Sequence, residues 1–497
     1  MGRNVGGPEP RWSLRVDVAL VVAFAGAAAA LRAPALGPAS LWLDDSWPAL
    51  VTKADRLHEV LLAGAWAPGF GFILKGWLGA VGFSELKAQL PPFLLGTVAP
   101  PLLYVVLVWR GLGRLAAGVG AFVLMTSSVH ITYSVRVKQY TLDAVCVIVL
   151  LAVLWWLLED VSEKRRWWYL AATGTVAIAV SSLSAVVAGS GVAVALLLLL
   201  RRNRGSIRVA LPAVSELALF GGAWWWFVLR PRVTTSLREE FHARFFGIDA
   251  GVGEALRDLA GAAVVVVRGA VQLPGPIEGL VVLAAAVVVL WRRPTLGLLL
   301  LAPLALAVVL AAARAAPLGT GRTDVYLYPL LAVLVALAAH EALTVAPRAT
   351  ALALGTLAAA SLATYRAPNY PREVVRPLVR EVETITTDRD AILIAPKAGY
   401  AFGLYTKWPV DLVSSDEVQQ GFTVRIRRPN VVLLGRLRPT GPDGRVERVV
   451  RTHDSIWVLA SHGRPPRALD RILAARGFKR ISLRREPGAS LEHWSRG

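Results

Sequence analysis

The sequence contains very little cysteine, little methionine and few charged residues for its length. Its one cysteine among 497 residues, Cys146, lies inside an apolar run. A single cysteine excludes an intrachain disulfide and a metal site built from several thiolates, so we interpret Cys146 as a structural thiol. The P-loop, a GxGxxG after a strand, the HExxH pair and paired CxxC motifs are also missing. The sequence therefore gives no support to the nucleotide-binding and zinc-enzyme classes that those motifs define.

The shortage of charge is matched by an excess of apolar residues. Charged residues make up 18% of the chain and hydrophobic residues 55%, whereas an ordinary soluble domain carries more charge. Runs such as VIVLLAVLWWLL and TLGLLLLAPLALAVVLAAA approach or reach the length that crosses a bilayer. No small-residue cleavage site follows the first apolar segment, which argues against a signal peptide. The fold class predicted is a polytopic α-helical membrane protein.

Acidic residues are fewer than basic ones: the chain has 34 Asp and Glu and 54 Lys and Arg, which gives a net charge of +20. In a soluble protein this excess would first indicate nucleic acid. Here the basic residues cluster at the ends of apolar segments, where they set topology and meet anionic lipid. We therefore predict membrane lipid, and no nucleic acid, among the partners.

We predict about eleven membrane spans. Connections rich in Lys and Arg, such as EKRR and RRNRGSIR, are assigned to the cytoplasm, which puts the amino terminus inside and everything after Tyr365 outside. The membrane predicted is a bacterial plasma membrane. The spans are expected near residues 16–36, 88–109, 115–132, 141–158, 168–186, 186–200, 209–229, 277–291, 295–313, 325–342 and 349–365.

The first outer loop is expected to contain helices that lie along the membrane surface. PALVTKADRLHEVLLA, residues 48–63, has apolar positions at helical spacing and charge on the opposite face. PGFGFILKGWLGAVG, residues 68–82, is short, rich in glycine and carries Lys75, which suits a surface helix. The alternative, in which residues 68–82 form a span, would reverse the side of every later loop.

From about residue 370 the chain changes character, so we predict two domains, 1–369 in the membrane and 370–497 outside it. Strand-like runs (AILIAP, NVVLLG, SIWVLAS, KRISL) alternate with helical stretches such as PRALDRILAARG, which predicts a small α/β domain. Residues 371–497 hold 23 Lys and Arg and 14 Asp and Glu, a net charge of +9. Such a domain either rests on anionic headgroups or an acidic polymer, or is simply solvated.

Polar clusters at membrane depth are costly and often mark function. Four of them lie on the predicted outer face. They comprise Asp44 and Asp45; His130, Tyr133, Arg136, Lys138, Tyr140 and Asp143; Glu239, Glu240, His242 and Arg244; and Arg314, Arg322, Asp324, Tyr326 and Tyr328.

This combination suits a phosphorylated lipid that carries a sugar. Arg, Lys and Tyr can hold a phosphate while apolar walls take the lipid chain. A carboxylate can accept the proton of an acceptor hydroxyl as it attacks the sugar. Plainer interpretations stay open for each motif: a solvated acidic pair, Arg136 and Lys138 as headgroup anchors, tryptophans of the interfacial belt, and His130 as a satisfied polar residue.

The order of these motifs resembles a known family. LWLDDSW, the glycine-rich segment from Pro68, and HITYSVRVKQYTLD together resemble bacterial membrane glycosyltransferases of the GT-C fold, especially those related to protein O-mannosyltransferases and lipid A aminoarabinose transferases. The resemblance covers residues 36–160 and returns at GRTDVYLYPLLAVL. It implies a polyprenyl-phosphate sugar as donor and an inverting transfer to an extracytoplasmic envelope acceptor.

The resemblance also implies roles for individual residues. Asp44 and Asp45 match the family's acidic pair, with Asp44 at the position of the general base. Arg136 stands where the family commonly has Glu, and Trp66 and Ala67 replace the residues that precede the second surface helix. A monophosphate donor needs a divalent cation less than a diphosphate does, so Mg²⁺ or Mn²⁺ on Asp44 and Asp45 is an option and not a requirement. The donor-phosphate ligands implied are Arg136, Lys138, Tyr140, Arg322 and Tyr328.

The sequence is therefore consistent with three functions. The first is a hexosyl or pentosyl transferase acting on a polysaccharide, glycolipid or protein of the cell envelope. The second is a transporter or flippase of lipid-linked sugars, although no inverted repeat is visible. The third is a non-enzymatic envelope assembly protein whose carboxy-terminal domain binds cell-wall polymer. The sequence leaves the sugar, the acceptor and the oligomeric state open.

Overall fold

The computed structural model describes residues 14–64, 67–202, 207–232, 239, 245, 251–371, 373–416, 418, 420–434, 445–463 and 467–497. The chain divides into two compact units. The first, called here the helical unit, is Met1–Ala35, Pro92–Trp225 and Phe241–Pro368. The second, the loop–sheet unit, is Leu36–Pro91, Trp226–Glu240 and Asn369–Gly497. The first outer loop and the carboxy-terminal domain thus belong to the same unit.

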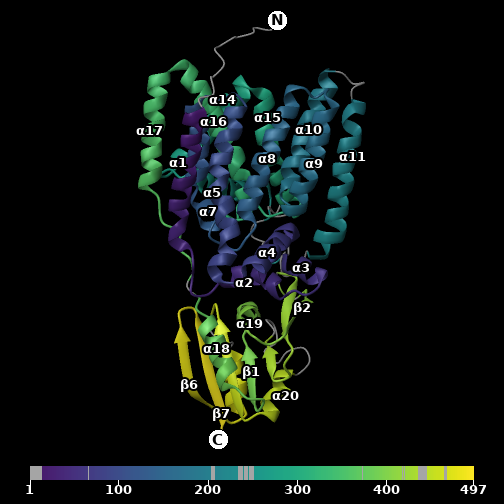
Figure 1. The fold of residues 1–497 in the computed structure, drawn as a ribbon, viewed down its shortest axis with the longest axis vertical. Helices are drawn as coiled ribbons and strands as arrows, with labels where there is room; N and C mark the ends of the chain where they lie inside the picture. The colour runs from purple at the N-terminus through teal and green to yellow at the C-terminus, as the bar shows by residue number, and fades with distance from the viewer. Residues whose placement is uncertain are drawn as a thin grey trace. The chain divides into compact units, whose positions relative to one another are not determined.

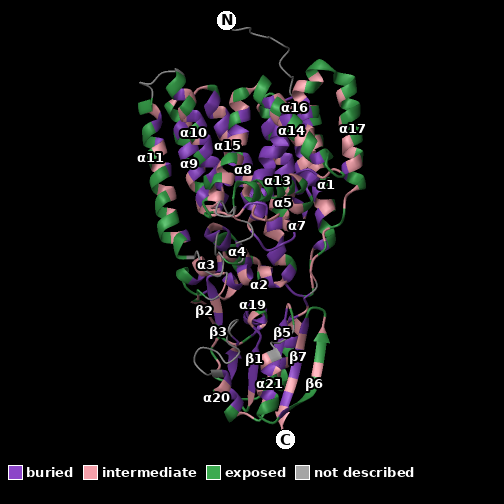
Figure 2. Ribbon diagram, turned by 180° about the vertical axis from the view of Figure 1, so that it is seen from behind, coloured by how far each residue is buried: buried purple, intermediate pink, exposed green. Residues whose placement is uncertain are grey.

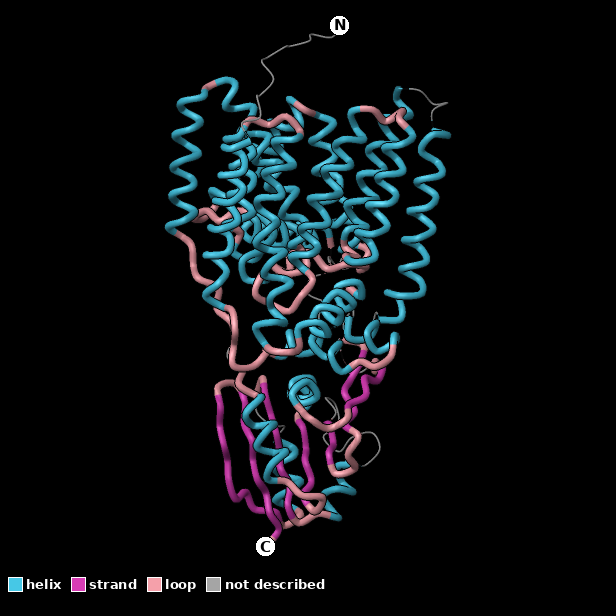
Figure 3. Tube along the Cα trace, in the orientation of Figure 1, coloured by secondary structure: helices cyan, strands magenta, loops and turns pink. Residues whose placement is uncertain are grey.

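The helical unit is a bundle of apolar helices (Figures 1 and 3). Each of the eleven segments predicted to span overlaps at least one helix, and two of them, 115–132 and 168–186, run across the break between two helices. Among the described residues, seven helices are long and apolar enough to cross a membrane: α1, α5, α8, α10, α11 with its continuation, α15 and α16. The helices are α1 (Leu14–Arg32), α5 (Glu85–Trp109), α6 (Arg114–Thr126), α7 (Ser128–Tyr133), α8 (Tyr140–Glu159), α9 (Lys164–Val180), α10 (Ser184–Arg202), α11 (Ile207–Ala223), the π-helical continuation η4 (Trp224–Leu229), α13 (Val252–Ala270), α14 (Ile277–Arg292), α15 (Pro294–Ala312), α16 (Tyr328–Val345) and α17 (Pro347–Ala363).

The remaining predicted spans fall on four shorter helices. α6, α9, α14 and α17 have 13, 17, 16 and 17 residues, below the roughly 20 residues that a straight span needs. The count of eleven therefore stays a prediction.

One helix of this unit was not predicted. α13 lies between the predicted spans 209–229 and 277–291, where no span is expected, and it packs against α7, α14 and α16. Its charged residues include Glu254, Arg257, Asp258 and Arg268, and they interrupt the continuous apolar run that marks a span. α13 is amphipathic, a pattern that a search for apolar runs does not detect.

Ion pairs tie the helix ends that were predicted to be cytoplasmic. Glu159, at the end of α8, accepts from Arg110 after α5 and lies 3.5 Å from Arg166 of α9. Asp17 of α1 accepts from Arg114 of α6 at 2.7 Å and from Tyr104 of α5 at 2.8 Å. These contacts join α5, α8 and α9, and α1, α5 and α6, at their ends.

The first outer loop folds into short helices, as predicted: α2 (Leu43–Ala49), the 3₁₀ helix η2 (Leu50–Lys53), α3 (Leu57–Gly64) and α4 (Pro68–Val81). α3 and α4 meet at an angle of 115°, so together they do not make one straight span. A Cβ atom on Gly71 would lie 3.0 Å from the Cα atom of Gly64, so this corner needs glycine. Lys75 of α4 donates to the carbonyl groups of Val51 and Ala54, which joins α4 to η2. Their position at a membrane surface stays a prediction.

The carboxy-terminal part is an α/β domain, as predicted. Its main sheet has the order β4-β1-β5-β7-β6, with β1 parallel to β4 and β5, and β7 antiparallel to β5 and β6. β2 and β3 form a separate antiparallel pair. The strands are β1 (Asp390–Ile394), β2 (Val410–Ser414), β3 (Phe422–Ile426), β4 (Val431–Leu433), β5 (Ser455–Ser461), β6 (Phe478–Glu486) and β7 (Ala489–Arg496).

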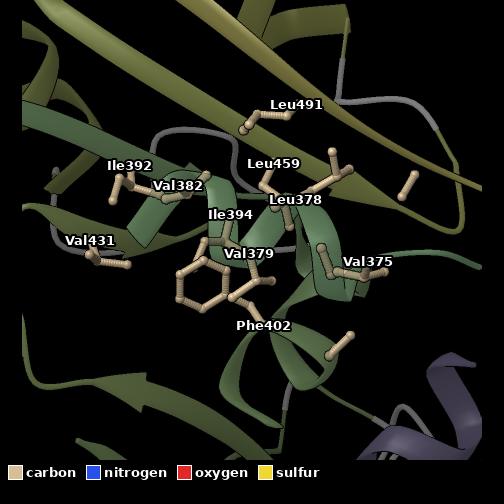
Figure 4. Close-up of a cluster of buried hydrophobic side chains, with 13 residues drawn as sticks. Val375, Leu378, Val379, Val382, Ile392, Ile394, Phe402, Val431, Leu459 and Leu491 are labelled. Carbon is tan, nitrogen blue, oxygen red and sulfur yellow. The ribbon is translucent and has the colours of Figure 1, made fainter. Parts of the chain in front are cut away.

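Helices cover both faces of this sheet. One core, drawn in Figure 4, joins α18 (Arg376–Ile385) and α19 (Gly399–Tyr405) to β1 through Leu378, Ile392 and Phe402. The opposite core joins α20 (Arg445–Thr452) and α21 (Arg467–Ala475) to the other side of β1 and β5. Figure 2 shows β1 buried and much of the edge strand β6 exposed. The sequence predicted β1, β4, β5, β6, α18 and α21 and missed the remaining elements.

Candidate functional site

The predicted acidic pair lies in the first turn of α2. Asp45 is fully buried and Asp44 is half-buried. The hydroxyl of Tyr370 donates to Asp45 Oδ2 at 2.6 Å and accepts from the backbone N–H of Trp42 at 3.1 Å. The carboxylate of Asp45 is therefore oriented by a side chain of the carboxy-terminal domain.

A third carboxylate lies beside this pair. Glu373 Oε2 accepts from the backbone N–H of Leu43 at 3.1 Å. Burial raises the pKa of Glu373 above its ordinary value, and the neighbouring charge of Asp44 raises it further. His462 Nδ1 lies 3.7 Å from Glu373 Oε2 and accepts from Trp42 Nε1 at 3.1 Å. The aromatic that precedes the acidic pair is thus held by a histidine that the sequence analysis did not single out.

Further hydrogen bonds join the same loop to the carboxy-terminal domain. Tyr405 accepts from the backbone N–H of Leu41 at 2.6 Å. The backbone N–H of Arg376 donates to Ser40 Oγ at 3.1 Å, and its guanidinium binds both oxygens of Glu85 at 3.0 and 3.1 Å. The loop carrying the acidic pair is consequently fixed on both sides of α2.

The predicted cationic residues belong to the helical unit. Arg136 and Lys138 lie in the turn between α7 and α8 and are buried, with 7% and 5% of their surface exposed. Tyr140 begins α8, and its ring meets that of Tyr133 edge to face, 4.7 Å between centroids. Two cations and two tyrosines therefore gather within eight residues of chain.

A buried arginine at the end of α1 supports this turn. Arg32 donates to Ser134 Oγ at 3.0 Å, to the carbonyl groups of Ala28 at 2.9 Å and Met125 at 3.4 Å, and bonds His130 Nδ1 at 2.9 Å. None of these partners is a carboxylate, so a full positive charge is kept in a dry setting by neutral groups. Arg32 is not recognisable as a structural centre from the sequence, because an arginine at a span end has an ordinary topological explanation.

The polar cluster between Arg314 and Tyr328 is built around a glycine-rich turn before α16. Asp324 accepts from the backbone N–H groups of Gly319 at 3.1 Å and Gly321 at 2.8 Å, which shapes the turn that carries Arg322. Burial raises the pKa of Asp324, and these amide hydrogen bonds oppose the rise. A Cβ atom on Gly319, where φ is +72°, would lie 2.6 Å from the Cα atom of Ala262, so α13 passes directly against the turn.

Tyr328, the first residue of α16, is buried, and within the described part of the chain its hydroxyl has no hydrogen-bond partner. A Cβ atom on Gly269 of α13 would lie 2.1 Å from that hydroxyl. α13 thus comes close to α16 here because glycine leaves room for the tyrosine. An unpartnered buried hydroxyl is a donor available for a ligand.

The structure groups the predicted residues as follows. Asp44 and Asp45 share the loop–sheet unit, while Arg136, Lys138, Tyr140, Arg322 and Tyr328 share the helical unit. The 3₁₀ turn η8 (Val325–Leu327), just before Tyr328, packs against α8, which Tyr140 begins. Of the remaining cluster, Glu240, His242 and Arg244 lie outside the described residues, as does Trp66.

The described donor set does not fit a protein-held metal ion. Within the ranges that the structure describes, no group of three or more His, Cys, Asp or Glu side chains could hold one. One oxygen of Asp45 is engaged by Tyr370, and one oxygen of Glu373 by the N–H of Leu43. We therefore derive no step through a metal.

Among the comparisons with known proteins, only the search of solved structures found matches. A scan against protein-family models and a search of curated proteins found no match. The Archaeoglobus fulgidus oligosaccharyltransferase, solved with zinc and sulfate, matches at TM-score 0.50 and 13% identity, over 88% of this chain and 67% of that chain. The same organism's oligosaccharyltransferase AglB, solved with an inhibitory peptide and a dolichol-phosphate, matches at TM-score 0.50 and 12% identity, over 90% and 70%.

The chain has the GT-C fold. The fold predicted from sequence is therefore confirmed, and this GT-C chain is a multi-pass membrane protein. ArnT from Cupriavidus metallidurans also matches, at TM-score 0.45 and 12% identity, over 96% of this chain and 98% of that chain. At such identities the likeness concerns the fold, and the chemistry has to be argued from the residues.

Proposed function

We propose that this GT-C protein is a glycosyltransferase that moves a sugar from a polyprenyl-phosphate donor to an acceptor of the cell envelope. The observation that carries the proposal is the carboxylate pair on α2, held by Tyr370 in a chain of this fold. A neighbour of the same fold was solved with a dolichol-phosphate, which is a ligand of the proposed class. The site of reaction would be the outer face of a bacterial plasma membrane, with the amino terminus in the cytoplasm and the carboxy-terminal domain outside.

We assign the general base to Asp44. The acceptor hydroxyl attacks the anomeric carbon, its proton passes to the Asp44 carboxylate, and the bond from that carbon to the phosphate oxygen breaks with inversion. Asp44 suits this role better than Asp45, because Asp44 is half-buried whereas Asp45 is fully buried and accepts from Tyr370. Asp45, held by the Tyr370 hydroxyl, would orient the first turn of α2, which carries Asp44.

We assign the donor phosphate to the cationic residues. Lys138 and Arg136 would balance the charge that grows on the departing phosphate, which makes polyprenyl phosphate a better leaving group. Arg322 and the hydroxyls of Tyr140 and Tyr328 would add donors, and the buried Tyr328 hydroxyl is available for this. Arg32 would hold the turn that carries Arg136 and Lys138 through its bond to Ser134.

The donor and acceptor are proposed only by class. The donor is a monophosphate-linked hexose or pentose on a polyprenyl chain, and the acceptor is an envelope polysaccharide, glycolipid or protein. A divalent cation, Mg²⁺ or Mn²⁺, is not needed for this scheme, since Lys and Arg side chains can meet the charge of a monophosphate.

The test is release of polyprenyl phosphate from a panel of polyprenyl-phosphate sugars by the purified full chain. Asp44→Asn should keep donor binding and lower turnover by about 10²- to 10⁴-fold, the range typical of a general base. Asp388→Asn is the matched control, because that carboxylate is 92% exposed.

The outcomes separate the proposals. Turnover retained in Asp44→Asn would remove Asp44 from the base role. Release from one sugar only would identify the donor. A wild-type protein that neither releases nor binds any member of the panel would contradict the transferase and favour a transporter or an assembly protein.

A further inference from the structure

We propose that the carboxy-terminal α/β domain supplies positioning residues for the carboxylate pair, and that these are Tyr370 and Glu373. The catalytic half of this inference rests on the proposed function, whereas its structural half does not. It gives a role to a domain in which the sequence shows no catalytic motif.

Side chains of the carboxy-terminal domain accept hydrogen bonds from backbone N–H groups at the start of α2. The first N–H groups of a helix have no partner within the helix, and a capping side chain normally accepts from one of them. Trp42 occupies the capping position and makes no side-chain cap hydrogen bond. Instead, the N–H of Leu43, the first residue of α2, donates to Glu373, and the N–H groups of Leu41 and Trp42, just before the helix, donate to Tyr405 and Tyr370. All three acceptors come from the other end of the sequence, so the domain binds the start of α2 through three consecutive backbone amides.

The residues that bind the loop are spaced regularly. In YPREVVR, residues 370–376, every third residue is engaged: Tyr370 with Asp45, Glu373 with Leu43, and Arg376 with Glu85. This segment, which leads into α18, is called here the latch. Because its partners lie before, within and after α2, the latch fixes the orientation of the helix as well as its position.

Tyr370 connects the latch directly to the carboxylates. Its hydroxyl accepts from the N–H of Trp42 and donates to Asp45, so the two bonds can form only with α2 in one register. Glu373 contributes through its oxygen Oε2, which accepts from the N–H of Leu43 and lies 3.7 Å from His462 Nδ1. Removing either side chain would loosen the pair without touching the donor-binding residues.

The first measurement is hydrogen exchange of the backbone amides of residues 41–43, in the purified full chain. Tyr370→Phe removes one hydroxyl, and Glu373→Leu removes the acceptor for Leu43. Glu373→Leu should raise exchange of the Leu43 amide by about ten- to a hundredfold, the range for a hydrogen bond to a charged group. Tyr370→Phe should raise exchange of the Trp42 amide by about two- to tenfold, the range for a bond between neutral groups. Glu373→Gln keeps an oxygen acceptor and should restore protection at Leu43.

Tyr400→Phe is the matched control. Tyr400 is a buried tyrosine of the same domain, and its hydroxyl donates to the carbonyl of Phe422 at 2.6 Å. This variant should leave exchange at residues 41–43 unchanged. If Tyr370→Phe changes exchange no more than this control, the latch is overturned.

The second measurement is steady-state turnover with whichever donor of the polyprenyl-phosphate panel is accepted. Tyr370→Phe should lower kcat about tenfold or more and leave the KM for the donor unchanged, because donor ligands are not displaced. Raised exchange with unchanged kcat would overturn the positioning role. Raised exchange in a protein whose wild type accepts no donor would support the latch while contradicting the proposed function.

Discussion

The cationic cluster and the carboxylate pair are built by opposite means. Arg136, Lys138 and Tyr140 come from one short stretch of chain, and their turn is held by Arg32 through neutral oxygen and nitrogen atoms. Asp45 is held by Tyr370, 325 residues further along the sequence. The cationic cluster therefore depends on contacts within the helical unit, whereas the carboxylate pair depends on the carboxy-terminal segment of the loop–sheet unit. Damage to either should leave the other intact.

The largest expected effect on stability comes from Arg32. Arg32→Met removes four hydrogen bonds and leaves Ser134 and His130 in a dry setting, which should cost about 3–5 kcal/mol. We expect thermal unfolding, followed by tryptophan fluorescence, to shift strongly, and donor binding to weaken with it. Arg348→Met, at an exposed arginine of α17, is the control and should cost less than about 0.5 kcal/mol. An equal response of the two variants would show that the arginine network does not support the cationic cluster.

Gly269 tests the contact between α13 and Tyr328. Gly269→Ala places a methyl group 2.1 Å from the Tyr328 hydroxyl, and such overpacking should cost about 1–3 kcal/mol. Gly279→Ala, in α14, meets nothing within 4 Å and should be neutral or stabilise by up to about 1 kcal/mol, because alanine suits a helix better. The measurement is the difference in unfolding temperature. If both variants shifted the unfolding temperature in the same direction, α13 would be able to move away from Tyr328 without loss of stability.

The smallest expected effect on stability comes from replacing a glutamate by glutamine, once in each of the two units. Glu85→Gln weakens the bidentate pair with Arg376, in which Glu85 is 7% exposed, and should cost about 1 kcal/mol. Glu159→Gln weakens a pair whose carboxylate is 53% exposed, so it should cost less than about 0.5 kcal/mol. Denaturation curves of both variants provide the test. A larger loss of unfolding free energy in Glu159→Gln than in Glu85→Gln would show that the buried ion pair of the loop–sheet unit is not the stronger of the two.

Much of the helical unit could be predicted because its signals are local. Each predicted span overlaps a helix, since a run of apolar residues of the right length determines both. α13 escaped prediction because its charged residues interrupt the apolar run that marks a span. Its amphipathic periodicity is visible in the sequence, but only the structure shows that it packs against α14 and α16.

The candidate site divides in the same way. Asp44, Asp45, Arg136 and Lys138 could be proposed from motif order, and the structure describes all four as buried or half-buried. Tyr370, Glu373 and His462 could not be proposed, because each is an ordinary residue until the chain brings it to α2. The three-residue spacing in YPREVVR is visible in the sequence, but it indicates a latch only when its partners are known.

The latch has a consequence for how the protein is made. Trp42 and its partner Tyr370 are 328 residues apart, so at about 5–20 residues per second α2 waits roughly 15 to 65 s for the latch during synthesis. A ribosome that stops before Tyr370, or a protease that removes the carboxy-terminal domain, leaves a chain with its apolar helices and an α2 without the latch. Completion of the polypeptide thus becomes a condition for an ordered carboxylate pair.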